Sequence, residues 1–265
     1  MKRTIINRFI CALLILLLLS VFTIGVFAQN GAISWYCVHR KDHKQPMVDS
    51  TISFIEEYNG YYIDKHHGDD CEDKVIYLTF DAGYENGNVE KILDVLKTEE
   101  VSGAFFVLGN LIEKNSDLIS RMFDEGHLVC NHTYSHKAMI GKTREEISTE
   151  LRKLENTCLE KTGNAMAKYY RPPEGKFDEE SMKMISELGY KTVFWSFAYA
   201  DWDNDKQMSA ESAKKKILEN IHNGEVMLLH PTSSTNAEIL EDIIRELKSQ
   251  GFRFGTLDEL CRGEC

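Results

Sequence analysis

The stretch Lys74–Gly83, which reads KVIYLTFDAG, decides the fold class of this chain. Its almost continuous run of apolar and β-branched residues predicts a β-strand over residues 74–80, and Asp81 follows that strand directly. Apolar runs of this kind recur along the sequence and alternate with segments whose apolar residues repeat every three to four positions. This alternation is typical of repeated βα units around a largely parallel sheet.

Seven such units predict an α/β fold, a distorted (β/α)7 barrel. The seven strands are expected at Lys74–Phe80, Gly103–Leu108, His127–Asn131, Ala167–Arg171, Lys191–Phe197, Glu225–His230 and Phe252–Thr256. Between them, Thr143 and Glu146 have the spacing of a capping box, and Ser209 and Asn236 are expected to cap helices. Cys158 lies on an apolar helical stripe and is expected to pack inward.

The first 28 residues differ from the rest of the chain. Three basic residues precede a nearly unbroken apolar run from Phe9 to Ala28. This pattern predicts an export segment, either a cleaved signal peptide or a retained membrane anchor. Everything after Gln29 is then extracytoplasmic, and the membrane is contacted only through residues 1–28 if they stay attached.

The remaining chain divides into three parts. Residues 29–73 are polar and aromatic and are expected to form an N-terminal extension, residues 74–261 form the barrel domain, and residues 262–265 form a short tail. The whole chain has 31 Lys and Arg against 42 Asp and Glu, a net charge of −11. This charge argues against nucleic acid as a partner and against a face that binds an anionic bilayer through charge. We expect a monomer.

Unusual polar side chains follow the carboxyl ends of the predicted strands. Because parallel strands of a barrel gather these ends on one rim, we expect the side chains to form one site there. They are Asp81, His132, His136, Arg171, Asp201, Trp202 and His230. Pro172, Pro173 and Pro231, three of only four prolines, adjoin the same rim.

Each residue also has a structural interpretation when taken alone. Asp81 can cap the following helix, and His230 can be a buried core histidine. Arg171 can be a surface charge, although its place before two prolines suits a fixed carboxylate partner, for which Asp81 is the candidate. His132 and His136 can be a solvated loop pair, but histidines four apart on one helical turn would point at a common metal ion. Asp201 can be a turn residue. Their expected meeting on one rim favours a site.

The motifs resemble those of the polysaccharide deacetylase family, also called the NodB-type or carbohydrate esterase 4 family. The matching motifs are Thr79–Gly83, His132–His136, Arg171–Gly175, Asp201–Trp202 and Leu228–His230, and the match extends over about residues 74–260. The string TFDAGYENG at Thr79–Gly87 resembles the branch that deacetylates N-acetylmuramic acid in peptidoglycan and forms delta-lactam in spore cortex.

The resemblance implies a role for each residue. His132 and His136 would bind a divalent metal, usually zinc, and Asp81 would be the general base. His230 would protonate the departing amine, with Asp201 tuning its imidazole. Arg171 would hold Asp81, and Leu228 would line the slot for the acetyl methyl. Trp202 and Pro172 would contact the glycan.

The sequence departs from the family pattern beside the base. Ala82 stands where the family usually has a second Asp as the third metal ligand, which leaves the identity of the metal open. Ala198 also stands where an Asp is frequent. Cys130, two residues before His132, is either a soft metal ligand or a small core residue.

Three functions follow as hypotheses. The leading one is metal-dependent N-deacetylation of N-acetylmuramic acid residues in peptidoglycan strands. The alternatives are deacetylation of N-acetylglucosamine in peptidoglycan or chitooligosaccharides, and glycan binding without catalysis. Six cysteines follow the export segment; a disulfide between Cys37 and Cys71 and another between Cys261 and Cys265 are hypotheses that the sequence does not decide.

Overall fold

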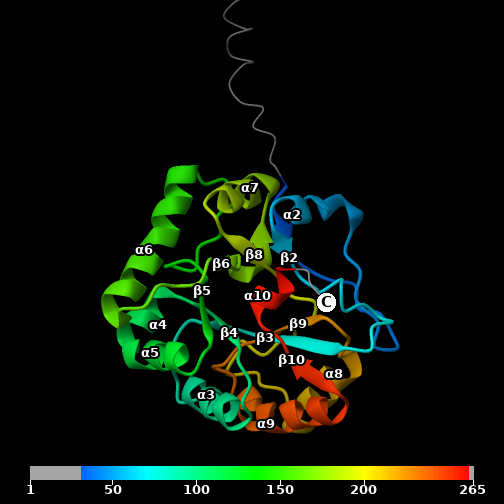
Figure 1. The fold of residues 1–265 in the computed structure, drawn as a ribbon. Coiled ribbons are helices and arrows are strands. Elements are labelled where there is room, and N and C mark those ends of the chain that lie inside the picture. Colours follow the sequence, from blue (N-terminus) through cyan, green and yellow to red (C-terminus); the bar gives the residue numbers. More distant parts are fainter. Residues whose placement is uncertain (1–30, 263–265) are drawn as a thin grey trace, which may run out of the picture. The chain divides into compact units, whose positions relative to one another are not determined.

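The structure is a computed structural model that describes residues 31–262 (Figure 1). The predicted export segment and residues 263–265 of the predicted tail lie outside these residues. The described residues from Ile33 onward form one compact unit, and the boundary predicted at residue 73 falls inside it. Among the described residues, no helix has both the length and the apolar composition needed to cross a membrane.

The seven predicted strands are all present. They are β3 (Lys74–Ala82), β4 (Ala104–Val107), β5 (Leu128–Asn131), β6 (Tyr169–Tyr170), β8 (Lys191–Val193), β9 (Glu225–Leu229) and β10 (Phe252–Phe254). They run parallel in the order β10-β3-β4-β5-β6-β8, and β9 also pairs with β3. A parallel bridge between Phe197 and Met227 links the segment after β8 to β9 and closes the sheet. The predicted distorted barrel is confirmed.

Helices connect these strands and surround the sheet (Figure 1). They are α3 (Val89–Thr98), α4 (Gly109–Lys114), α5 (Ser116–Asp124), α6 (Arg144–Thr162), α7 (Glu179–Glu187), α8 (Ala210–Asn220), α9 (Ser234–Ser249) and α10 (Leu257–Leu260). Thr143 and Glu146 form the predicted capping box of α6, and Ser209 caps α8. The cap predicted at Asn236 is wrong, because Ser233 caps α9 and Asn236 lies buried inside that helix.

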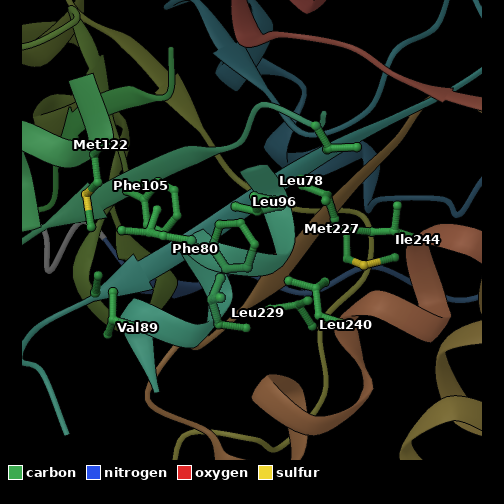
Figure 2. Packing of buried hydrophobic residues seen from close by; sticks show 14 of the residues in the cluster. Leu78, Phe80, Val89, Leu96, Phe105, Met122, Met227, Leu229, Leu240 and Ile244 are labelled. Atoms are coloured by element: carbon green, nitrogen blue, oxygen red, sulfur yellow. The ribbon is translucent and has the colours of Figure 1, made fainter. Parts of the chain in front are cut away.

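Alternation along β3 separates two layers of core. Ile76, Leu78 and Phe80 face the helices, and Figure 2 shows Phe80 beside Phe105, on which its ring stacks at a centroid distance of 4.7 Å. Val75 and Tyr77 belong to a second cluster, in which Cys130 is also buried. Because successive side chains of a strand point to opposite faces, Asp81 shares the face of Val75 and Tyr77. The strand thereby directs Asp81 toward the barrel interior.

The N-terminal extension contributes a strand that the sequence did not predict. β2 (Gly60–Tyr61) pairs in parallel with β8 and lengthens the sheet. The short elements around it are β1 (Ile33–Ser34), η1 (Ser50–Ile52), α2 (Phe54–Glu57), and, from the barrel, η2 (Pro173–Gly175) and β7 (Lys176–Phe177), which pairs with β1. Trp35 stacks on Phe194 at 4.4 Å and fixes the extension to the barrel.

The disulfide hypothesis for Cys37 and Cys71 is not met, since both are free thiols in the structure. The Cys37 Sγ atom instead donates a hydrogen bond to the Trp195 carbonyl at 3.3 Å. Cys261 is also free, and its suggested partner Cys265 lies outside the described residues. The extension is therefore held by packing and hydrogen bonds in this structure.

The strand predicted at Lys191–Phe197 ends early, at Val193. Arg171 donates to the carbonyl oxygens of Val193 and Phe194, and the Trp35 indole donates to that of Trp195. Side chains, and not a neighbouring strand, therefore bind the carbonyl oxygens of residues 193–195, and this interrupts the hydrogen-bond ladder of the predicted strand. Regular contact with β9 resumes at Phe197.

Candidate active site

A cavity of about 820 Å³ opens at the carboxyl ends of the strands. Most of the residues that the sequence analysis singled out line it: Asp81, His132, His136, Trp202, Leu228 and His230. The structure thus brings together side chains that are up to 149 positions apart in the sequence, 230 minus 81. Arg171 and Asp201 are not part of the lining; each is buried behind it and bonded to a residue that is.

Asp81 is held by a buried arginine. Arg171 Nη1 donates to Asp81 Oδ1 at 2.8 Å, and its Nη2 donates to Thr79 Oγ1 at 2.9 Å. The guanidinium is fully buried and also lies over the Phe106 ring at 4.1 Å. Burial acts to raise the pKa of Asp81, but the charge of Arg171, helped by nearby histidines, outweighs it and holds that pKa below its usual range. Asp81 is therefore an ionised carboxylate at neutral pH.

The two histidines of the second motif lie on a loop. The expected helical turn is wrong, because Thr133 and His136 have positive φ angles of 67° and 58°. Asn131 stabilises the turn by accepting a hydrogen bond from the Thr133 N–H at 2.9 Å. The two imidazoles nevertheless lie close together, edge-on, with ring centroids 5.0 Å apart.

His132 has the protonation state of a metal ligand. Its Nδ1 lies 2.9 Å from the Arg171 carbonyl oxygen, which only accepts, so Nδ1 carries the proton and Nε2 has the free lone pair. Burial lowers the pKa of His132 to about 4, which keeps the ring neutral. Its Nε2 lies 3.5 Å from Asp81 Oδ2. Two electron-pair donors that face each other in this way suit a cation beside them.

The donor set is nevertheless short of the three protein ligands that catalytic zinc sites usually have. Within residues 31–262, no three His, Cys, Asp or Glu side chains are arranged around a common point for a metal. Ala82, at the position of the missing ligand, is buried in the apolar cluster of Phe80. Cys130 is fully buried in the core cluster that contains Phe106, and it forms no such three-residue group with the two histidines. The chemistry of His132 and His136 fits a cation that has these two imidazoles as its protein ligands.

His230 lines the same cavity, and the carboxylate of Asp201 binds both its imidazole and its backbone N–H. Its Nδ1 is 2.7 Å from Asp201 Oδ1, and its backbone N–H donates to Asp201 Oδ2 at 2.8 Å. Burial acts to lower the pKa of His230, but the hydrogen bond and charge of Asp201 outweigh it and raise that pKa above its ordinary value. Because Nδ1 is occupied, Nε2 is the nitrogen that remains for a bound molecule.

Asn236 is a site residue that the sequence analysis missed. Its Nδ2 donates to Asp201 Oδ2 at 2.6 Å and to the His230 carbonyl at 3.1 Å, and its Oδ1 accepts from the Tyr199 hydroxyl. Asn236 therefore orients the carboxylate of Asp201, which in turn orients the imidazole of His230. The sequence signal for this role is the amide that interrupts the apolar stripe of α9, a signal that a helix cap at Asn236 also fits.

Aromatic side chains form part of the wall. Trp202 is 61% exposed and its ring lies 6.2 Å from that of His230 in an edge-on arrangement. Tyr84 is 43% exposed and was not singled out from the sequence; its hydroxyl oxygen accepts a hydrogen bond from Asn204 Nδ2 at 2.5 Å. This bond links the loop after β3 to the loop after β8. Pro172 is buried and absent from the lining, so the structure does not bring it to the cavity.

Comparisons with known proteins show which proteins this chain is similar to. The sequence profile described as "Polysaccharide deacetylase" matches residues 68–193. The peptidoglycan-N-acetylmuramic acid deacetylase PdaA of Bacillus subtilis is 40% identical over 232 residues, which is 87% of this chain and 86% of that protein. A peptidoglycan-N-acetylglucosamine deacetylase of Bacillus cereus is 35% identical over 70% of this chain and 67% of its own length.

Solved structures are similar as well. That of Bacillus subtilis PdaA, described as a family 4 carbohydrate esterase, superposes with a TM-score of 0.82 at 39% identity and covers 88% of this chain and 98% of its own. A family 4 carbohydrate esterase from Bacillus anthracis superposes with a TM-score of 0.72 at 35% identity, over 89% of this chain and 99% of its own.

Proposed function

The chain belongs to the polysaccharide deacetylase family, and we propose that it removes the acetyl group from N-acetylmuramic acid residues of peptidoglycan. It is a hydrolase that acts on an amide bond, as its relatives are. The choice of sugar rests on the similarity to PdaA over most of both chains. Delta-lactam formation in spore cortex is the setting that the resemblance of the Thr79–Gly87 string implies.

One observation carries the proposed chemistry: a carboxylate and an imidazole with opposite pKa perturbations line one cavity. The pKa of Asp81 is lowered, so it is ionised and accepts a proton, whereas the pKa of His230 is raised, so it retains a proton to donate. Amide hydrolysis needs both functions, because the water must lose a proton and the amine is a poor leaving group until it gains one.

The residues divide the reaction as follows. Asp81 takes a proton from the attacking water while Arg171 fixes the orientation of the carboxylate. The water oxygen bonds to the acetyl carbon, the C–N bond breaks, and His230 gives its Nε2 proton to the departing nitrogen. The products are acetate and a free amine on the glycan. Leu228, which lines the cavity, contacts the acetyl methyl, and Trp202 provides an apolar surface for the sugar ring.

His132 and His136 are the residues that would hold a divalent metal. A bound metal would act as a Lewis acid that stabilises negative charge on the acetyl oxygen. Zinc is the expected ion from the resemblance, and with two protein imidazoles it would be held less tightly than in a three-ligand site. Cobalt or manganese with extra water ligands are the alternatives to test.

Deacetylation of N-acetylglucosamine is the second candidate, favoured by the similarity to the Bacillus cereus enzyme. The decisive experiment is acetate release from purified peptidoglycan with and without a chelator, followed by mass-spectrometric identification of the modified sugar. Free amine on muramic acid is the expected result, and free amine on glucosamine alone would overturn that choice. Loss of turnover in Asp81→Asn and in His230→Ala, with a cooperative thermal unfolding transition retained in each variant, is the expected control result.

Glycan binding without catalysis is the remaining hypothesis, based on Ala82 and Ala198. The bonded pairs Asp81–Arg171 and His230–Asp201 argue against it, since binding alone does not need a paired base and acid. No acetate release from any glycan with any divalent metal would support it. A peptidoglycan substrate implies that the enzyme acts outside the cytoplasm, and we propose that it acts as a monomer.

A further inference from the structure

A hairpin in the N-terminal extension presents apolar side chains to solvent. Val38 and Met47 pair antiparallel, with N–H to carbonyl distances of 2.8 Å and 3.1 Å in the two directions. Residues paired in this way carry their side chains on the same face. Tyr36, two residues before Val38, is exposed as they are. Tyr36, Val38 and Met47 are 60%, 55% and 61% exposed. We call these three residues the apolar hairpin face.

The opposite face of the same segment is fixed to the barrel. The Trp35 indole donates to the Trp195 carbonyl at 2.8 Å, and Cys37 donates to the same oxygen at 3.3 Å. The segment therefore alternates between buried and exposed residues as an edge strand does, but its exposed residues are apolar where polar ones are usual. A contiguous exposed apolar patch on a fixed scaffold marks an interaction surface.

The tip of the hairpin is basic in an acidic protein. Residues 39–44 read HRKDHK and are all exposed. Three basic residues against Asp42 give the tip a charge of +2, whereas residues 29–265 carry 28 minus 42, or −14. Arg40 has one distant ion pair, with Asp69 at 3.7 Å, and Lys41 and Lys44 make none with any described residue. Asp69 also accepts a hydrogen bond from the Gln45 N–H and lies beside the tip, so Lys41 and Lys44 are the charges available to an anionic partner.

We propose that this hairpin binds the surface of an anionic lipid bilayer. Tyrosine prefers the membrane interface, the aliphatic Val38 and Met47 suit the acyl boundary, and basic residues are attracted to anionic headgroups. A glycan surface is less suitable, because sugars are bound by the flat faces of aromatic rings, and only Tyr36 of the three has one.

The position of the hairpin in the sequence agrees with this occupant. Tyr36 lies eight residues after Ala28, where the apolar run ends. Eight extended residues span at most about 29 Å. The hairpin is therefore within reach of any bilayer in which residues 9–28 are held, and it would keep the barrel at that surface.

The test uses the chain from residue 29 onward, so that the apolar run itself does not bind lipid. This chain keeps the whole compact unit from Ile33 onward with all of its core clusters. Co-sedimentation with phosphatidylglycerol-containing vesicles is compared with that on pure phosphatidylcholine vesicles. We expect binding to the anionic vesicles, weakened by salt, and little binding to the neutral ones.

Two variants and one control separate the contributions. The change Lys41→Glu with Lys44→Glu should lower the partition coefficient by about 30-fold or more. Replacing all three residues of the apolar hairpin face by serine should also lower it. The control, Lys161→Glu with Lys183→Glu, makes the same charge change at exposed positions of α6 and α7 and should retain most of the binding.

Equal losses in the control and in the hairpin variants would reduce the effect to net charge and overturn the proposal. Absence of binding by the unaltered chain would overturn it too. A third outcome is that the unaltered chain binds peptidoglycan sacculi but not vesicles, and that the hairpin variants lose this binding. That outcome would assign the hairpin to the wall polymer instead. Thermal unfolding of each variant shows that the fold is retained.

Discussion

Two hydrogen bonds join His230 to the carboxylate of Asp201: the imidazole Nδ1 lies 2.7 Å from Oδ1, and the His230 backbone N–H donates to Oδ2 at 2.8 Å. The second bond fixes the position of the main chain, and the first fixes the ring and its tautomer. With Nδ1 occupied, Nε2 is the proton donor available to the substrate. One buried carboxylate therefore sets both the orientation and the acidity of the proposed general acid.

Asp201→Asn should lower kcat by about 10²- to 10³-fold, within the usual contribution of a positioned acid. It should also move the basic limb of the pH–rate profile to lower pH. The acid must be protonated to act, and the charge that raises the pKa of His230 is lost. The profile of acetate release measures both effects. Asp203→Asn, which changes a carboxylate paired with Lys206, is the matched control and should leave the limb in place.

Arg171→Met should move the acidic limb of the profile to higher pH. Asp81 must be ionised to act as a base, and without the arginine charge burial raises its pKa. The free energy of unfolding should fall by about 3–5 kcal/mol, because a buried ion pair loses one partner. Thr79→Val, which removes one hydrogen bond to the arginine and keeps its charge, should not shift the limb. An unchanged limb in Arg171→Met would contradict the assigned pairing.

Asn236→Ala should lower kcat about tenfold and leave KM nearly unchanged, because Asn236 orients Asp201 and does not line the cavity. Steady-state kinetics on soluble peptidoglycan fragments give the two constants separately. Thr235→Ala removes a neighbouring hydrogen bond, to the Met208 carbonyl, and serves as the control. A rise in KM with unchanged kcat would assign Asn236 to substrate binding instead.

Metal removal should be easy and reversible. With two imidazole ligands, we expect dialysis against a chelator to abolish acetate release and an added divalent ion to restore it. Calorimetric titration of the dialysed protein should show weaker binding in His132→Ala by about 10- to 100-fold or more. Cys130→Ser should bind the metal as the unaltered chain does, because Cys130 packs in the core. Reduced affinity in Cys130→Ser would return the thiol to the list of ligands.

Much of the fold could be predicted because it depends on local patterns. The apolar run at Lys74–Phe80 and the six other apolar runs predicted the strands, because a strand buried on both faces has to be apolar over its length. The capping box at Thr143 and Glu146 is satisfied within one helical turn. β2 escaped prediction because a two-residue strand has no period to detect, and its pairing depends on β8, which is more than a hundred residues away.

The site was predictable in composition but not in its supporting contacts. Strand ends of a parallel barrel meet on one rim whatever the loops do, so Asp81, His132 and His230 were expected together. The loop conformation of His132–His136 was not expected. It depends on the positive φ angle of Thr133, in a turn that the side chain of Asn131 stabilises. The early end of β8 likewise depends on the side chain of Arg171, which reaches carbonyl groups of a neighbouring segment.

The sequence by itself determined the barrel, the family resemblance and which reactive groups end its strands, because these follow from residue type and period along the chain. The tertiary structure alone decided the state of those groups: the lowered pKa of Asp81, the raised pKa of His230, the burial of Ala82 and Cys130 in the core, and the role of Asn236. Burial and charge act through space, and the partners that set them lie on different strands and helices.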